Sequence, residues 1–148
     1  MTGVAIHIDT RDLTAIDARF KRLAARVADM TPLMDEIGSM LVASTIDRFE
    51  NGVDPTGAPW TPSIRALSEG GKTLINSGRL MTSVTHDPGR DAVEVGTNVI
   101  YAAIQQAGGR AGRGHAATIP ARPYLGLSAG DEREIGHIVD DYLAEAIQ

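Results

Sequence analysis

The segment Ile119–Ser128 (IPARPYLGLS) constrains the fold of this chain more than any other. Pro120 and Pro123 fix the backbone φ angle and lack an N–H donor, so this strip cannot continue a helix or lie inside a sheet. Ser128, at its end, precedes an acidic run with apolar periodicity and is a preferred residue for capping a helix. The sequence therefore predicts a rigid extended edge that leads directly into a capped final helix.

Apolar periodicity predicts one strand and two helices in the first third of the chain. Val and Ile alternate with smaller or polar residues and predict a short strand at residues 4–9. Apolar side chains spaced by three or four residues from Leu13 to Met30 predict an amphipathic helix, which Thr10 or the aspartate before it would cap. Thr31 is the expected cap of a second helix, with a proline at its first position and an end at Asn51–Gly52.

Residues 53–73 are predicted to form a long irregular arm. Three prolines, together with several glycines, disfavour regular structure across most of this stretch. An irregular segment of this length is unusual in a compact domain, so the arm is either functional or ordered by a partner. Its single tryptophan, Trp60, either holds the arm on the protein core or anchors a neighbouring subunit, because tryptophan is frequent in both places.

The second half of the chain is predicted to combine short elements with turns. Ser77 is the expected cap of a short helix, and residues 88–91 (PGRD) are the expected turn of a β-hairpin. A helix over residues 97–107 is expected to end at two glycines, and a Gly/Arg loop follows at residues 108–118. The final helix begins after Ser128, with a capping box in which Asp replaces the usual Glu.

These elements predict a single α+β domain over residues 1–148. Two helices come first, a small, mainly antiparallel sheet follows and a helix ends the chain, so helices and strands are segregated. The length suits one hydrophobic core, and the scarcity of aromatic residues predicts that this core is aliphatic. The lack of cysteine excludes disulfides and thiolate metal sites, and no apolar run is long enough to predict a membrane span.

Charge is distributed unevenly along the chain. The net charge of −5 argues against general affinity for nucleic acid. Residues 95–130 hold three arginines and no acidic residue, whereas residues 131–148 hold six acidic residues and one arginine. Either these are ordinary solvated faces, or the basic segment contacts the acidic helix of a neighbouring copy, with Arg122 beside the acidic side chains of that helix.

The candidate interface residues are the segregated charges and the aromatic side chains near them. They are Trp60, Arg110, Arg113, Arg122, Tyr124, Asp131, Glu134, Asp140 and Asp141. Arg110 and Arg113 lie among glycines and alanines, so their segment is either a disordered surface loop or a contact with a partner or with DNA.

Two short motifs resemble catalytic motifs but lack their context. Residues 66–73 (ALSEGGKT) match a relaxed phosphate-binding loop, yet no apolar strand precedes them. Residues 126–130 (GLSAG) match a serine nucleophile elbow, but the one histidine downstream, His137, lies on the helix that this serine is expected to cap. The four histidines lie on different predicted elements, without metal-binding spacing. We therefore predict no catalytic residue, no cofactor, no metal and no enzyme activity.

Four sequence blocks occur in a fixed order along the chain. They are PTGAPW at residues 55–60, LINSGRL at 74–80, YAAIQQAGG at 101–109 and IPARPYLGLS at 119–128. In this order and spacing they resemble the phage virion morphogenesis family, the tail-completion proteins of contractile-tailed, Mu-like phages. The resemblance spans nearly the whole chain, and it departs from the family pattern in a Gly- and Arg-containing insert at residues 110–117.

The resemblance implies a structural virion protein that completes or terminates the tail and joins it to the head connector. Such a protein would be a homo-oligomer, most simply a hexameric ring that matches the tail tube, with DNA passing through its lumen. Its partners would be tail-tube and head-connector proteins, with no membrane. It would be made in the host cytoplasm and reside at the head-proximal end of the tail. The alternative is a nucleic-acid-binding packaging or regulatory factor that uses the Arg110–Arg122 segment.

Overall fold

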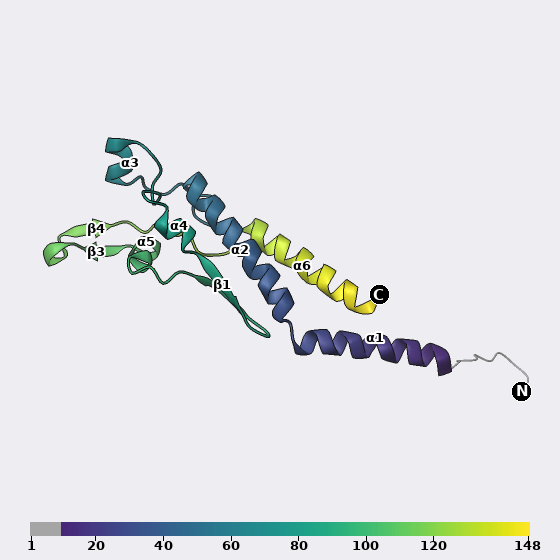
Figure 1. Ribbon diagram of the computed structural model, residues 1–148. Coiled ribbons are helices and arrows are strands. Elements are labelled where there is room, and N and C mark those ends of the chain that lie inside the picture. Colours follow the sequence, from purple (N-terminus) through teal and green to yellow (C-terminus); the bar gives the residue numbers. More distant parts are fainter. Residues whose placement is uncertain (1–9) are drawn as a thin grey trace, which may run out of the picture.

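The computed structural model describes residues 10–148, and the strand predicted at residues 4–9 lies outside the described residues. At its centre is helix α2 (Thr31–Asn51), and the last helix, α6 (Ala129–Ile147), packs beside it. Helix α1 (Thr10–Ala28) leads into the N-terminal end of α2 and contacts α6 (Figure 1). The molecule is elongated, with α1 at one end and the short elements of the middle of the chain at the other.

The junction between α1 and α2 differs from the predicted one. Thr31 is the first residue of α2 rather than its cap, and Met30 occupies the N-cap position without a capping side chain. The carboxylate of Asp29 accepts hydrogen bonds from the Thr31 N–H (3.1 Å) and hydroxyl (2.5 Å), so it stabilises this turn instead. The predicted end of α2 is confirmed, because Gly52 has a left-handed conformation (φ 68°) and its N–H donates to the Arg48 carbonyl.

The first hairpin follows its predicted turn. Strand β1 (Thr85–Pro88) pairs antiparallel with β2 (Val93–Gly96), and the Gly89 N–H donates to the Ala92 carbonyl at 2.7 Å to close the turn. Helix α2 packs on both strands, so one face of this small sheet is covered by a helix. The α+β class is confirmed, with the strands arranged as two separate two-stranded hairpins rather than one sheet.

Gly38 of α2 allows the first hairpin to approach the helix closely. It is buried, and a Cβ atom built on it would lie 2.5 Å from Cδ2 of His86 and 2.7 Å from Cγ2 of Val93. These distances are well inside van der Waals contact, so a larger residue would force the hairpin away from α2. Asp35, about one turn earlier on α2, lies 2.8 Å from Nε2 of His86 and fastens β1 to the same helix face.

Residues 108–118, predicted as a Gly/Arg loop, form the second hairpin. Strand β3 (Gly109–Ala111) pairs antiparallel with β4 (Ala117–Ile119), and the 3-10 turn η1 (Arg113–His115) joins them. Figure 1 shows this hairpin projecting from the body of the molecule. Gly108 precedes it with φ 72°, and a Cβ atom there would lie only 2.7 Å from the backbone nitrogen of Ala121. A glycine is therefore required where the hairpin leaves the core.

The arm predicted to be irregular at residues 53–73 is partly regular. Ile64–Glu69 form helix α3, and the Ser63 hydroxyl caps it by accepting the Ala66 N–H at 3.1 Å. The prolines of the arm all precede this helix, so the composition that disfavours regular structure does not act on residues 64–69.

Two further short helices begin later than predicted. Helix α4 (Arg79–Thr82) has Gly78, and not Ser77, at its N-cap position. Helix α5 (Ala102–Ala107) starts after residue 101 because the Thr97 hydroxyl accepts the N–H two residues later (3.2 Å) and forms a turn there. The predicted end of α5 at two glycines is confirmed.

Buried side chains form two clusters along α2. The first joins the N-terminal half of α2 to α6 and consists of Leu33, Ile37 and Ile138. The second consists of Phe49, Trp60, Leu80, Val84, Ala102 and Tyr124. The prediction of an aliphatic core is right for the first cluster and wrong for the second, where the rings of Trp60 and Tyr124 pack against Phe49.

Candidate functional site

Arg122 anchors the proline-containing strip inside the protein. The residue is 6 % exposed, and its Nε donates to the Thr61 carbonyl at 2.7 Å. Its terminal nitrogens make longer contacts, 3.4 Å to Oε1 of Gln105 and 3.5 Å to the Pro62 carbonyl. The prediction that Arg122 contacts the acidic helix of a neighbouring copy is therefore wrong, because its guanidinium is directed into its own chain.

Tyr124 and Trp60, both predicted at an interface, are buried against Phe49. Tyr124 is 1 % exposed, its hydroxyl donates to the Ala102 carbonyl (3.0 Å), and burial raises the pKa of Tyr124. The Trp60 ring meets Phe49 edge-on at 5.7 Å, and its Nε1 donates to the Pro123 carbonyl (2.8 Å). Trp60 therefore holds the arm on the core of its own chain, which is one of the two roles predicted for it.

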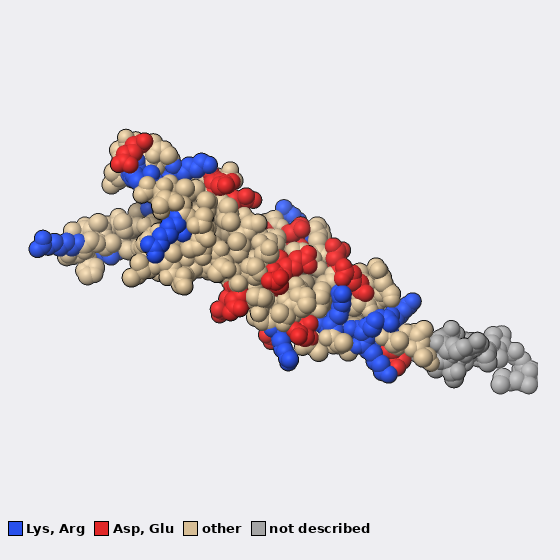
Figure 2. All heavy atoms as spheres, in the orientation of Figure 1, with Lys and Arg blue, Asp and Glu red and all other residues tan. Residues whose placement is uncertain are grey.

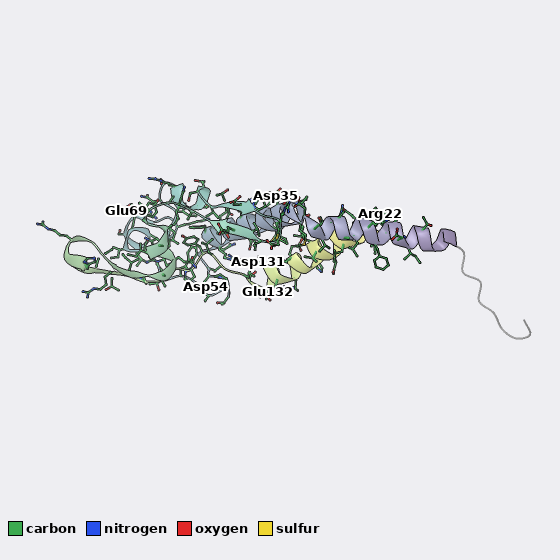
Figure 3. All side chains as sticks on the ribbon, turned by 90° about the horizontal axis from the view of Figure 1, so that it is seen from below. Arg22, Asp35, Asp54, Glu69, Asp131 and Glu132 are labelled. Carbon is green, nitrogen blue, oxygen red and sulfur yellow. The ribbon has the colours of Figure 1, made fainter. Side chains whose placement is uncertain are left out.

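Asp131, in the first turn of α6 (Figure 3), joins this helix to α2 within the chain. Its carboxylate forms a buried ion pair with Arg48 and accepts hydrogen bonds from the Ser44 hydroxyl (2.5 Å) and the Ser128 N–H (2.9 Å). Burial alone would raise the pKa of Asp131, but the hydrogen bonds from Ser128 and Ser44 and the charge of Arg48 outweigh it and lower the pKa. The predicted contact between Asp131 and a neighbouring copy is therefore also wrong.

The other charged candidates are exposed and lie on two different parts of the molecule. Arg110 and Arg113 belong to the projecting β3–β4 hairpin, and Figure 2 shows basic atoms at its tip. Glu134, Asp140 and Asp141 lie on the outer face of α6. The segregation of charge seen in the sequence thus becomes a basic hairpin and an acidic helix face.

Both sequences that match catalytic motifs have structural roles. The Ser128 hydroxyl accepts the Asp131 N–H (3.0 Å) while the Asp131 carboxylate accepts the Ser128 N–H, which confirms the predicted capping box. Lys72 lies in the turn after α3, where its carbonyl accepts the Arg65 guanidinium (2.8 Å), and a helix rather than a strand leads into this turn. Within residues 10–148, no group of three or more His, Cys, Asp or Glu side chains could hold a metal ion.

Apolar side chains are exposed at both ends of the molecule. On α1, Ile16 and Phe20 are 48 % and 65 % exposed, and with Ile147 of α6 they line a hollow of about 250 Å³. On α3, Ile64 and Leu67 are 85 % and 73 % exposed. Groups of exposed apolar side chains mark contact surfaces, so both ends are candidates for contacts with partners. In the sequence, the surface on α3 is indicated by the spacing of three residues between Ile64 and Leu67.

A groove with three arginines lies beside α3 and α5. Arg65, Arg79 and Arg122 are among its lining residues, no aspartate or glutamate is among them, and its volume is about 380 Å³. We call it the arginine groove. The sequence predicted a role for only one of these arginines, because they come from three separate segments that the fold brings together.

Residues 11–144 match the family model of the phage virion morphogenesis family. The chain belongs to this family. It is 36 % identical over 137 residues to the Mu-like prophage FluMu G protein 2 of Haemophilus influenzae, a match that covers 93 % of this chain and 95 % of that protein. It is 34 % identical over 122 residues to the putative capsid assembly protein G of Escherichia phage Mu, with 76 % and 78 % covered. No solved structure matches this chain.

Family membership confirms the resemblance predicted from the four sequence blocks. It gives the protein a role in the structure or assembly of a phage particle. None of the helices in the described part of the chain is long and apolar enough to cross a membrane.

Proposed function

We propose that this protein completes the tail of a phage particle at its head-proximal end and joins it to the head connector. Its family and its likeness to a putative capsid assembly protein support a place in particle assembly. The observation that carries the proposal is the exposure of apolar side chains on α1 and α3, at opposite ends of an elongated molecule. A protein at a junction must contact neighbours on more than one side, and two separate apolar surfaces suit that position.

The protein acts as a ring of identical copies, six in number to match the tail tube. A ring needs a heterologous interface, in which one patch of each copy meets a different patch of the next. The molecule differs in shape from one end to the other, so it offers different patches for such a contact (Figure 1).

We expect the purified protein to assemble into a species of several copies, alone or when tail tubes are added. Native mass measurement would show it directly. Replacing Leu67 with aspartate should weaken assembly, because it places a charge on the exposed apolar face of α3. Leu127→Asp is the matched control, since Leu127 is 51 % exposed and belongs to neither apolar end surface. A protein that stays monomeric even with tail tubes present would contradict the ring.

The protein fulfils this role without catalysing a reaction. Lys72→Ala and Ser128→Ala should both leave the number of infectious particles unchanged, because one residue lies in a turn and the other caps a helix. Ser128→Ala should cost only about 1 kcal/mol of stability through the lost cap. Loss of infectivity with a stable, normally incorporated variant protein would overturn the structural role of that residue.

A second candidate function is nucleic-acid binding by the β3–β4 hairpin. It is favoured by the exposure of Arg110 and Arg113 on a projecting element, although Arg122 is buried and does not contribute. In a ring, the hairpin could contact DNA in the lumen and the two functions would coexist. Strong, salt-dependent DNA binding by the isolated protein that is lost in Arg113→Ala would favour this alternative.

A further inference from the structure

The arginine groove carries positive charge that its own lining does not balance. Arg65 is held at one wall, where its Nη2 donates to the carbonyls of Lys72 (2.8 Å) and Ile75 (3.1 Å). Arg122 is also held by uncharged acceptors, with one short contact to a carbonyl and two long ones. No carboxylate lines the groove, so both cations are neutralised only by dipoles.

The burial of Arg122 makes this imbalance unusual. Buried arginines are normally paired with a carboxylate, because a guanidinium loses its hydration when it leaves water. Desolvation lowers the pKa of Arg122. A guanidinium offers five N–H donors, and the two terminal nitrogens of Arg122 make only long contacts within the chain. The floor of the groove therefore favours an anion.

Arg79 supplies an exposed cation at the same groove. It is the first residue of α4, and no hydrogen bond or ion pair holds its guanidinium among residues 10–148. Exposed apolar side chains occur on the neighbouring elements, with Ile64 and Leu67 on α3 and Ile100 (94 % exposed) before α5. An occupant should therefore combine carboxylates with an apolar surface.

The outer face of α6 fits this description. Asp140 and Asp141 are both exposed, and no ion pair between described side chains uses either of them. Two other acidic residues of α6 already form ion pairs within the chain, Asp131 with Arg48 and Glu145 with Arg26. Ile147, on the same helix, is 49 % exposed and adds apolar surface.

We propose that the arginine groove receives the Asp140 and Asp141 carboxylates of the last helix of a second copy, with Arg79 as the cation that contacts them. This contact rests on the proposed ring and names the interface between its neighbouring copies. The groove and the outer face of α6 are different patches of one chain, so the contact is heterologous and repeats from copy to copy. Arg122 stays bound within its own chain and contributes only its positive potential at the groove floor.

Charge reversal tests the contact in the full-length protein. Arg79→Glu, and separately Asp140→Arg with Asp141→Arg, should each raise the dissociation constant for self-association by at least about tenfold, because like charges would face each other. Combining all three substitutions should restore assembly toward the wild-type level. Arg79→Lys should retain most of the self-association. Arg90 is an exposed arginine on the first hairpin, so Arg90→Glu is the matched control and should change self-association little. Sedimentation at low and high salt measures the self-association of every variant. Self-association of the wild-type protein should weaken as the salt concentration rises.

Three results would overturn the inference. If the Arg79→Glu variant assembles as well as the wild-type protein, the interface lies elsewhere and the proposed ring is unaffected. Failure of the wild-type protein to self-associate, even with tail tubes, would remove both the contact and the ring. Binding of a short single-stranded DNA that requires Arg79, while self-association of Arg79→Glu is unchanged, would assign the groove to phosphates rather than to carboxylates. Circular dichroism of each variant establishes that a change in assembly is not a loss of folding.

Discussion

Replacing Asp131 with alanine is expected to lower the free energy of unfolding by about 3–5 kcal/mol, because it leaves a buried cation without its anion. Arg48 is 5 % exposed, and its guanidinium would keep only the Tyr124 carbonyl (2.8 Å) and the Ser44 hydroxyl (3.1 Å) as acceptors. The substitution also removes the acceptor for the Ser128 N–H at the start of α6. Urea unfolding followed by far-UV circular dichroism measures the loss.

A double variant separates the orphaned charge from the other consequences of this change. Arg48→Met combined with Asp131→Leu removes both charges and fills the space with apolar atoms. It should be less destabilised than Asp131→Ala alone, because neither partner is left buried and unpaired. A double variant that is at least as unstable as the single one would show that the unpaired guanidinium is not the main cost.

Acid should weaken the same contact in the wild-type protein. Burial would raise the pKa of Asp131, but hydrogen bonds from Ser128 and Ser44 and the charge of Arg48 prevail and hold it below its ordinary value of 3.8. A carboxyl group with a lowered pKa contributes stability above its ordinary pKa, and this stability is lost as the pH falls through the folded-state pKa. The wild type should therefore lose more stability below about pH 4 than the Arg48→Met, Asp131→Leu variant. Equal losses would contradict this role of the carboxylate.

Sequence was sufficient for several arrangements in which a residue acts on its near neighbours along the chain, although it misplaced the N-terminal caps of α2 and α4. The capping box at Ser128, the glycine that ends α2 and the turn between β1 and β2 are all local hydrogen-bonding arrangements. The three long helices also follow from apolar spacing, which needs no knowledge of the fold. Helix α3 was not predicted, because the three prolines and the glycines of the arm suggested that the whole arm is irregular. All three prolines lie before the helix begins.

The burial of charged side chains could not be predicted in this way. Arg122 meets the carbonyl of Thr61, 61 residues earlier, and Asp131 meets Arg48, 83 residues earlier. Their positions in a basic and an acidic segment suggested a contact between copies, whereas the fold uses both charges inside one chain. The arginine groove was missed for the same reason, because its cations come from separate segments.

The proline-containing strip ties three parts of the molecule together. Arg122 holds the arm through the Thr61 carbonyl, Tyr124 holds α5 through the Ala102 carbonyl, and Ser128 begins the helix whose Asp131 is bound to α2. The two prolines fix the backbone of the strip, so these side chains project from a preorganised frame. The strip is therefore a structural hub of the chain.

Replacing Trp60 with alanine is expected to cost about 3–5 kcal/mol and to release the arm from the core. Trp60 is 6 % exposed, its ring packs edge-on against Phe49, and its Nε1 donates to the Pro123 carbonyl (2.8 Å). The truncation would leave a cavity and an unpaired carbonyl where residues 53–73 meet the strip. Urea unfolding measures the loss of stability, and limited proteolysis should find new cleavage sites in the arm.

Two control variants assign the effect to the buried ring and its hydrogen bond. Trp60→Phe keeps much of the apolar contact and loses the N–H donor, so it should be destabilised by less than the alanine variant, about 1–3 kcal/mol. Leu67→Ala changes an exposed residue of the same arm and should shift the stability by no more than about 0.5 kcal/mol. Unchanged stability of Trp60→Ala, with an arm that still resists protease, would contradict the role of Trp60 as its anchor.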